Sequence, residues 1–198
     1  MIDTFDKIKD LLVFESDDDF YLLQIIQRKK ENPLLGSNNR VIKNYYIRDL
    51  EYLENKYDEI KQLCVIFNAR AMLRLNKRSF RKVSFKALQN MANSMASQDY
   101  FFTSKSFDRA CGQGHNDKRK KWIVDIDNIV DKPTTKTDIE EMSNVINNCL
   151  PKGDKILTTL ETKNGYHLIT TPFNILEFRN HGYTVDIHKD NPVNLYIP

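Results

Sequence analysis

The stretch Trp122-Ile123-Val124-Asp125-Ile126-Asp127 is apolar at its start and acidic at its end. Its bulky and β-branched residues predict a buried strand. Side chains two apart on a strand share a face, so we expect Asp125 and Asp127 to emerge together while Ile126 points into the core. Two carboxylates at that spacing repel each other unless a cation lies between them, which is how proteins hold Mg²⁺ or Mn²⁺. The alternative is a strand that ends in solvent-facing acids.

A second segment of compatible chemistry is Gly165-Tyr166-His167, which follows a predicted tight turn at residues 163–165 and begins a strand. This position lets His167 and Asn164 face a ligand. A histidine there can donate a hydrogen bond to a phosphate or ligate a metal ion. The alternative is a hydrogen-bonded histidine of the core or of a sheet edge.

The third segment is Tyr183-Thr184-Val185-Asp186-Ile187-His188, another predicted strand, on which Asp186 and His188 share a face. A carboxylate between Val and Ile needs a partner, because an unpaired charge in apolar surroundings is costly. A metal ion shared with Asp125 and Asp127 would supply that partner.

The rest of the chain predicts an α/β (α+β) fold with a partly antiparallel sheet, because strands alternate with helices from residue 63 to residue 198. Strands are expected near residues 63–75, 122–127, 156–160, 166–170, 183–188 and 193–197, and helices near residues 84–95, from residue 137 and near residue 172. Residues 1–62 are expected to form a helical N-terminal lobe or brace, with a helix over residues 16–32, a short apolar piece over residues 41–47 and a helix from residue 48.

Composition and charge narrow the classes of function that the protein can have. Among 198 residues 40% are hydrophobic and 29% charged, which excludes a disordered or collagen-like chain. Three widely spaced cysteines and no apolar run of membrane-spanning length favour a cytoplasmic protein without membrane contact. Residues 61–130 hold 14 Lys and Arg but 5 Asp and Glu, so this segment carries +9 and the remainder −6 of the net +3. A cationic middle segment suggests a polyanionic ligand, although a solvated charged face is the alternative.

The order of the three motifs resembles that of the archaeo-eukaryotic primase superfamily, which includes the primase-polymerases. The resemblance covers residues 63–198 and implies a modified RNA-recognition-motif palm sheet with helices. It implies that Asp125, Asp127 and Asp186 bind the catalytic Mg²⁺ or Mn²⁺ and that His167 contacts the phosphates of the incoming nucleotide. Lys163 and Asn164 are further candidate phosphate contacts.

The function implied is a metal-dependent nucleotidyltransferase that joins nucleotides from nucleoside triphosphates to a nucleic-acid or nucleotide 3′-hydroxyl. The expected partners are a DNA or RNA template or primer and a helicase or replication protein. Two cationic groups are candidates for holding the nucleic-acid backbone: Arg74, Lys77 and Arg78, and Lys118, Arg119 and Lys120.

Two other classes of protein remain open. One is a non-catalytic nucleic-acid-binding module that stacks bases on Tyr45, Tyr46, Phe101 and Phe102. The other is a phage-type protein that interacts with a host factor through a degenerate primase fold.

Overall fold

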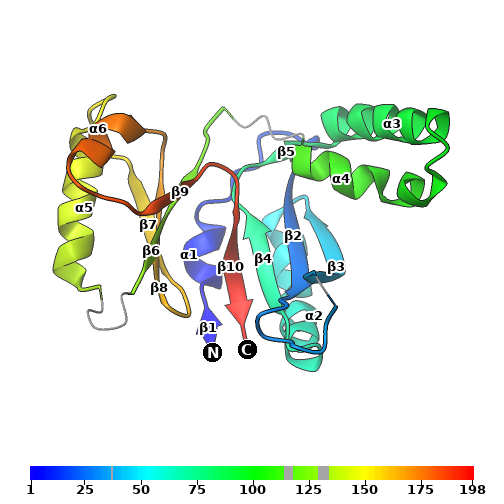
Figure 1. The fold of residues 1–198 in the computed structure, drawn as a ribbon, viewed down its shortest axis with the longest axis horizontal. Helices are drawn as coiled ribbons and strands as arrows, with labels where there is room; N and C mark the ends of the chain where they lie inside the picture. The colour runs from blue at the N-terminus through cyan, green and yellow to red at the C-terminus, as the bar shows by residue number, and fades with distance from the viewer. Residues whose placement is uncertain (37, 114–117, 129–133) are drawn as a thin grey trace.

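A computed structural model of the chain describes residues 1–36, 38–113, 118–128 and 134–198 (Figure 1). The described residues form a mixed α/β fold with two antiparallel sheets. In the first sheet the strand order is β1 (Ile2–Asp3), β10 (Pro192–Ile197), β4 (Arg70–Arg74), β2 (Asp19–Gln27) and β3 (Arg40–Ile47), and the short β5 (Arg78–Ser79) pairs with β2. In the second it is β7 (Ile156–Glu161), β8 (Gly165–Thr170), β6 (Trp122–Asp127) and β9 (Asp186–His188).

The longer helices lie outside the two sheets, which face each other (Figure 1). The short helix of residues 5–9 is an exception, because it lies between β10 and the second sheet, where the Lys7 ammonium donates to the Thr159 carbonyl at 3.0 Å. The short α1 (Phe5–Lys9) and the long α2 (Leu50–Ile66) contribute buried residues to the core of the first sheet. α5 (Lys136–Asn148) and α6 (Ile175–Asn180) cover the far side of the second sheet. α3 (Phe80–Ala96), the 3-10 helix η1 (Tyr100–Lys105) and α4 (Ser106–Gln113) form a hairpin that projects from one end of the first sheet (Figure 1).

The two faces of the second sheet have different surroundings. On one face Val124, Ile126 and Leu168 pack against α5 and α6. On the other face Ile123 and Ile169 join the hydrophobic core of the first sheet. Since side chains alternate along a strand, Asp125 lies on the same face as Ile123, the one directed toward the first sheet.

The helix expected over residues 16–32 is wrong, because residues 19–27 form β2 in the middle of the first sheet. Phe20, Leu22 and Leu23 are all buried, with neighbours on both faces of the strand. A short apolar run without alternation fits a doubly buried strand as well as a helix, and this one was assigned to the wrong class. Residues 40–47 also form a strand, so the N-terminal region is not a helical lobe.

Two further boundaries differ from the prediction. Residues 63–66, expected to begin a strand, are the last turn of α2, and the strand that follows is residues 70–74. Helix α5 is capped by Thr135, whose hydroxyl accepts from the Asp138 amide while the Asp138 carboxylate accepts from the Thr135 amide. The N-cap of this helix is therefore two residues before residue 137, where the helix was expected to begin. Within the described residues, none of the helices has the length and apolar character that a membrane span requires.

Candidate functional site

The strand register brings residues of the three motifs to one face of the second sheet. Asp125 on β6 lies directly opposite His167 on β8 and, on its other side, directly opposite Asp186 on β9. Opposed residues of neighbouring antiparallel strands share a face, with Cα atoms about 4.5–5.5 Å apart. His188 occupies the next position of that face and lies opposite Ile123. Segments separated by up to about sixty residues in the chain therefore meet at Asp125.

Asp127 lies one step further along the same face, and its cross-strand partner is Gly165. A Cβ atom on Gly165 would lie 1.9 Å from the carbonyl oxygen of Ile126, where real Cβ atoms are essentially never found. Glycine is therefore required here for the close approach of β8 to β6. The missing side chain also leaves Asp127 exposed to solvent at the end of its strand.

The Asp125 carboxylate lies close to two histidine side chains on this face. The Nε2 atom of His167 lies 3.2 Å from its Oδ1 atom, and the Nε2 atom of His188 lies 3.9 Å from its Oδ2 atom. The hydrogen bond with His167 lowers the pKa of the Asp125 carboxyl below its usual value, and partial burial opposes this effect. Asp125 is therefore a carboxylate at neutral pH, with imidazoles on two sides.

Two adjoining cavities, of about 340 and 470 Å³, open onto this face, and both are lined by Asp125, His167, Arg28 and Asn194. Arg28 follows the end of β2, and Asn194 lies on β10, so both come from the first sheet. The candidate site is thus a cleft between the sheets, with Asp125, His167 and His188 on one wall, whereas Asp186 is not among the residues that line the two cavities.

Arg28 and Asn194 were not predicted from the sequence. The guanidinium of Arg28, half-buried, makes no hydrogen bond or ion pair with the described residues. Asn194 is 7% exposed, and its Oδ1 atom has no hydrogen-bond partner in the part of the chain that is described. An unpaired guanidinium is suited to an anionic group, and an unpaired amide oxygen is suited to a hydrogen-bond donor such as a hydroxyl, so the two together fit a ligand that carries both. Neither residue belongs to a local motif, so the sequence carries no signal for them.

Lys163 and Asn164, predicted as phosphate contacts, line the larger of the two cavities. The Lys163 ammonium lies 3.4 Å from a carboxylate oxygen of Glu31, which also forms a two-point ion pair with Arg70. The hydrogen bond from Arg70 lowers the pKa of the Glu31 carboxyl, against a smaller opposing effect of burial. On this wall of the cleft the Glu31 carboxylate therefore interacts with two cations, Arg70 and Lys163.

The first cationic group does not reach the cleft. The Arg78 side chain is 0% exposed, and its guanidinium donates to Asp190 at 2.6 Å and to the carbonyl of Cys111 at 3.0 Å. Arg74 binds the same Asp190, while Lys77 binds Glu15 and Asp19. The prediction that Arg78 contacts nucleic acid is wrong, because its side chain is buried and holds the turn after β4 against the segment before β10.

The second cationic group lies on another part of the surface. Lys118 and Arg119 line a cavity together with Lys77 and Lys82, apart from Asp125. Arg119 pairs with Glu15 at 2.9 Å and keeps 72% of its side chain exposed, and Lys120 is also exposed. These side chains are accessible to a polyanion, but not as part of the cleft.

The four aromatic residues considered for base stacking differ in their exposure to solvent. Tyr45 is 2% exposed and donates its hydroxyl to Glu59, and the hydroxyl of Tyr46 donates to Asp108. Phe101 and Phe102, on η1, are 70% and 38% exposed. The tyrosine side chains have a structural role, whereas the phenylalanine side chains are exposed to solvent.

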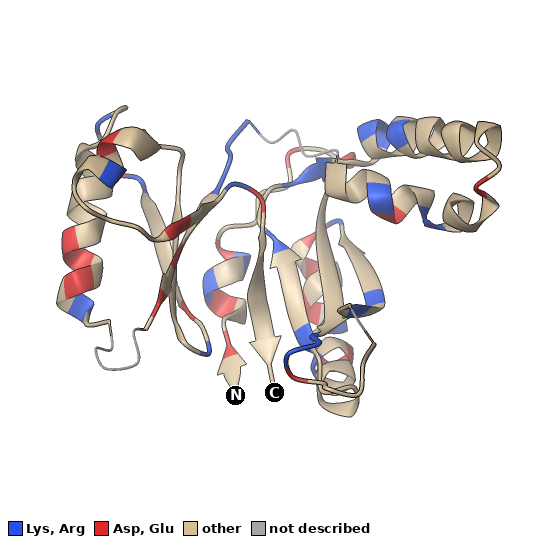
Figure 2. Cartoon of the chain, in the orientation of Figure 1, with Lys and Arg blue, Asp and Glu red and all other residues tan. Residues whose placement is uncertain are grey.

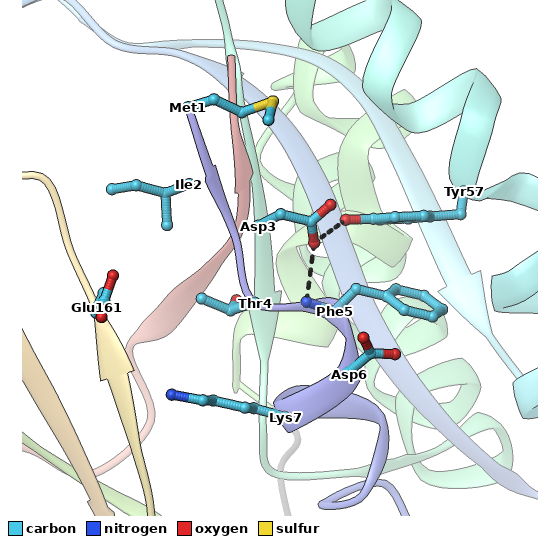
Figure 3. Close-up of a pocket in the computed structure, with 9 residues that line it drawn as sticks. All are labelled: Met1, Ile2, Asp3, Thr4, Phe5, Asp6, Lys7, Tyr57 and Glu161. Atoms are coloured by element: carbon cyan, nitrogen blue, oxygen red, sulfur yellow. Dashed lines mark hydrogen bonds between the residues drawn. The ribbon is translucent and has the colours of Figure 1, made fainter.

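A further cavity, of about 620 Å³, lies between β1, α1 and the end of β7 (Figure 3). Asp3 accepts hydrogen bonds there from the Phe5 amide at 3.1 Å and the Tyr57 hydroxyl at 2.6 Å. Burial, with the added effect of Asp3, raises the pKa of Tyr57. The cavity contains none of the predicted site residues, and its acids are already hydrogen-bonded or solvent-exposed.

In the described residues, no three His, Cys, Asp or Glu side chains converge closely enough to hold a metal ion as they stand. The kind of donor nevertheless fits a hard divalent cation, because Asp125, Asp127 and Asp186 supply carboxylates from one sheet face. Asp127 and Asp186 are exposed, and neither carboxylate accepts a hydrogen bond from a described residue. These two are the carboxylates available to a cation beside Asp125. The apolar surroundings expected for Asp186 are therefore wrong, because its side chain faces solvent.

Comparison of the chain with known protein families, with curated proteins and with solved structures found no match. The assignment of this cleft therefore rests on its own geometry and chemistry.

Proposed function

We propose that this protein is a metal-dependent nucleotidyltransferase of the primase-polymerase type, acting in the cleft between the two sheets. The observation that carries the proposal is the register of the second sheet, in which Asp125 is flanked directly by His167 and Asp186. This register gathers two carboxylates and a histidine, from motifs far apart in the chain, on one face of the sheet, and Asp125 and His167 also line the cleft.

The topology of the second sheet supports a palm of the RNA-recognition-motif type. Its elements follow one another as β6, α5, β7, β8, α6 and β9, a β-α-β-β-α-β sequence, and the strands are ordered β7-β8-β6-β9. This is the split β-α-β arrangement of ferredoxin-like sheets, in which the first and third strands are central. Asp125 and His167 lie on these two central strands.

In this proposal Asp125, Asp127 and Asp186 hold the metal ion or ions. Bound Mg²⁺ or Mn²⁺ supplies positive charge at the reacting phosphate and acidifies the attacking hydroxyl. His167 and Arg28 donate hydrogen bonds to the phosphates of the nucleoside triphosphate, and Asn194 fixes its orientation through the side-chain amide. The two walls of the cleft exclude water from one side of the nucleotide, which strengthens these contacts.

Nucleic acid would approach from the open side of the cleft. Lys118, Arg119 and Lys120 are the exposed cations of the segment just before β6, and in this proposal they hold the phosphate backbone. Such contacts are insensitive to sequence and weaken as salt rises.

The test is incorporation of labelled nucleotides on primed and unprimed single-stranded templates, with Mg²⁺, with Mn²⁺ and with neither. We expect Asp125→Asn and Asp186→Asn each to lower the rate more than about a hundredfold. Asp17→Asn, at an exposed acid remote from the cleft, serves as the matched control and is expected to retain the wild-type rate.

Incorporation that persists in both cleft variants, or that needs no divalent ion, would refute the proposal. If the wild-type chain incorporates nothing but binds labelled oligonucleotides, and both variants bind equally well, the non-catalytic nucleic-acid-binding function takes its place.

A further inference from the structure

The hairpin of α3, η1 and α4 is anchored only at its base. Val83 and Ala87 on α3 and Ala110 and Cys111 on α4 form a small core with Phe20 of β2. Beyond these residues the hairpin extends away from both sheets (Figure 1). Its distal half therefore has little contact with the rest of the described chain.

The outer face of α3 is apolar and exposed. Phe85, Leu88, Ala92 and Met95 follow one another at intervals of three, four and three residues, the spacing of a heptad seam. Phe85 is 65% exposed, Leu88 61% and Met95 57%. A helix in a folded protein normally turns such a stripe inward, but here the buried positions lie on the opposite side of the helix. The outer stripe, residues 85–95, has no partner in the described chain.

The charges on α3 itself have one sign, and the Asp18 carboxylate lies near Arg81 and Lys82. Arg81 continues the same spacing one turn earlier, Lys82 flanks it, and α3 contains no Asp or Glu. Lys86 lies on another side of the helix, where its ammonium donates to Gln89 at 2.9 Å. Figure 2 shows these cations gathered at the N-terminal end of the helix. The helix end is already capped, since the Asp18 carboxylate accepts from the Arg81 amide at 2.7 Å. None of the three cationic side chains forms a salt bridge with a described residue.

We propose that the outer face of α3 binds an acidic amphipathic helix of a partner protein. An apolar ridge on such a helix would cover Phe85, Leu88 and Met95, and its flanking carboxylates would face Arg81 and Lys82. This is a coiled-coil type of contact, in which apolar knobs supply affinity and flanking charges select the partner.

Charge decides against a second copy of the same chain. A paired α3 would bring more Lys and Arg to the seam and no carboxylate from its own helix. Single-stranded nucleic acid would satisfy the cations, but Phe85 is the one aromatic side chain of the stripe, and Leu88, Ala92 and Met95 offer neither charge nor an aromatic plane for stacking. An acidic helix satisfies both the stripe and its cationic flank.

The probe is a fluorescent 21-residue helical peptide with Leu at the a and d positions and Glu at the flanking positions. Its twin carries Lys in place of every Glu. Fluorescence anisotropy with the full chain is expected to show binding of the acidic peptide at least about tenfold tighter than of the basic one. Raising the salt concentration should narrow this difference.

Leu88→Ser and Lys82→Glu are each expected to weaken binding of the acidic peptide about tenfold or more. The matched control is Leu176→Ser, at an equally exposed leucine (71%) on α6, which should bind as wild type does. All these side chains are on the surface, and circular dichroism with urea unfolding confirms that each variant is folded.

Three results would overturn the proposal: equal binding of the two peptides, unchanged binding by Leu88→Ser, or reversible dimerisation of the chain that Leu88→Ser abolishes. Loss of oligonucleotide binding in Leu88→Ser with peptide binding intact would assign the face to nucleic acid instead. Nucleotide incorporation at Asp125 is expected to be unaffected by Leu88→Ser, so this test stands apart from that of the proposed function.

Discussion

Gly165→Ala is the substitution by which the geometry of the cleft is tested most directly. Gly165 pairs with Asp127, and the added Cβ would lie 1.9 Å from the Ile126 carbonyl oxygen. Ordinary van der Waals contact begins at 3.4 Å, so β8 and β6 must separate by about 1.5 Å, the difference between the two distances. The obstructing atom is backbone, which cannot rotate away as the end of a side chain would.

This separation acts on the site as well as on stability. Overpacking of this kind costs about 1–3 kcal/mol of unfolding free energy. His167 is two residues along the same strand, so its 3.2 Å contact with Asp125 is expected to lengthen beyond hydrogen-bond distance. The pKa of Asp125 would then rise toward its usual value, because the contact that lowers it most is lost. A misplacement of about 1 Å at a reacting centre costs about a hundredfold in rate.

The assays are urea unfolding followed by circular dichroism, carboxyl-carbon NMR titration of Asp125, and nucleotide incorporation. Gly112→Ala, on α4, is the matched control because no atom lies within 4 Å of its added Cβ. It is expected to be neutral or to stabilise by up to about 1 kcal/mol through helix propensity. The reasoning is refuted if Gly165→Ala unfolds within about 0.5 kcal/mol of wild type and leaves the pKa of Asp125 unchanged.

Three other predictions concern the surroundings of the cleft. Arg78→Met is expected to lower the unfolding free energy by about 1–3 kcal/mol, because the Asp190 carboxylate loses one of its two guanidinium partners and the Cys111 carbonyl loses its donor, while Arg74 still pairs with Asp190; a loss below about 0.5 kcal/mol in urea unfolding would contradict this. Glu31→Gln removes a carboxylate whose pKa is lowered by Arg70, so the excess stability of the wild type over the variant should be complete at neutral pH and vanish as the pH falls through the folded-state pKa, which lies below the usual value of a Glu carboxyl; a difference in stability that stays constant as the pH is lowered would exclude this explanation. Arg28→Ala should weaken nucleoside triphosphate binding about 10- to 100-fold with little change in stability, and a fluorescent-nucleotide titration with unchanged affinity would remove Arg28 from the site.

Where the sequence alternates or ends in turn residues, the prediction of structure was accurate. Residues 122–127, 156–161 and 165–170 form strands as expected, since each is bounded by turn or charged segments. The helix over residues 84–95 was also expected, and it forms the distal part of α3. Residues 19–27 were assigned incorrectly, because burial on both faces removes the alternation that distinguishes a strand from a helix.

For the candidate site, the sequence by itself determined that Asp125 and Asp127 lie on the same face of one strand. Residues two apart on a strand must share a face, so the pairing of Asp125 with Asp127 follows from local geometry alone. Cross-strand partners, by contrast, depend on register, and register depends on which strands are neighbours. The alignment of Asp125 with His167 and Asp186 is therefore a property of the folded sheet.

Only the tertiary structure decided which residues form the opposite wall of the cleft and which basic residues are buried or exposed. Arg28 and Asn194 face the cleft because two sheets built from distant parts of the chain meet there, and no local pattern encodes that meeting. A basic residue reads the same in sequence whether it is buried in an ion pair, as Arg78 is, or exposed, as Lys120 is. The difference comes from desolvation by neighbours that are remote in the chain, which is a property of three-dimensional packing and not of residue type.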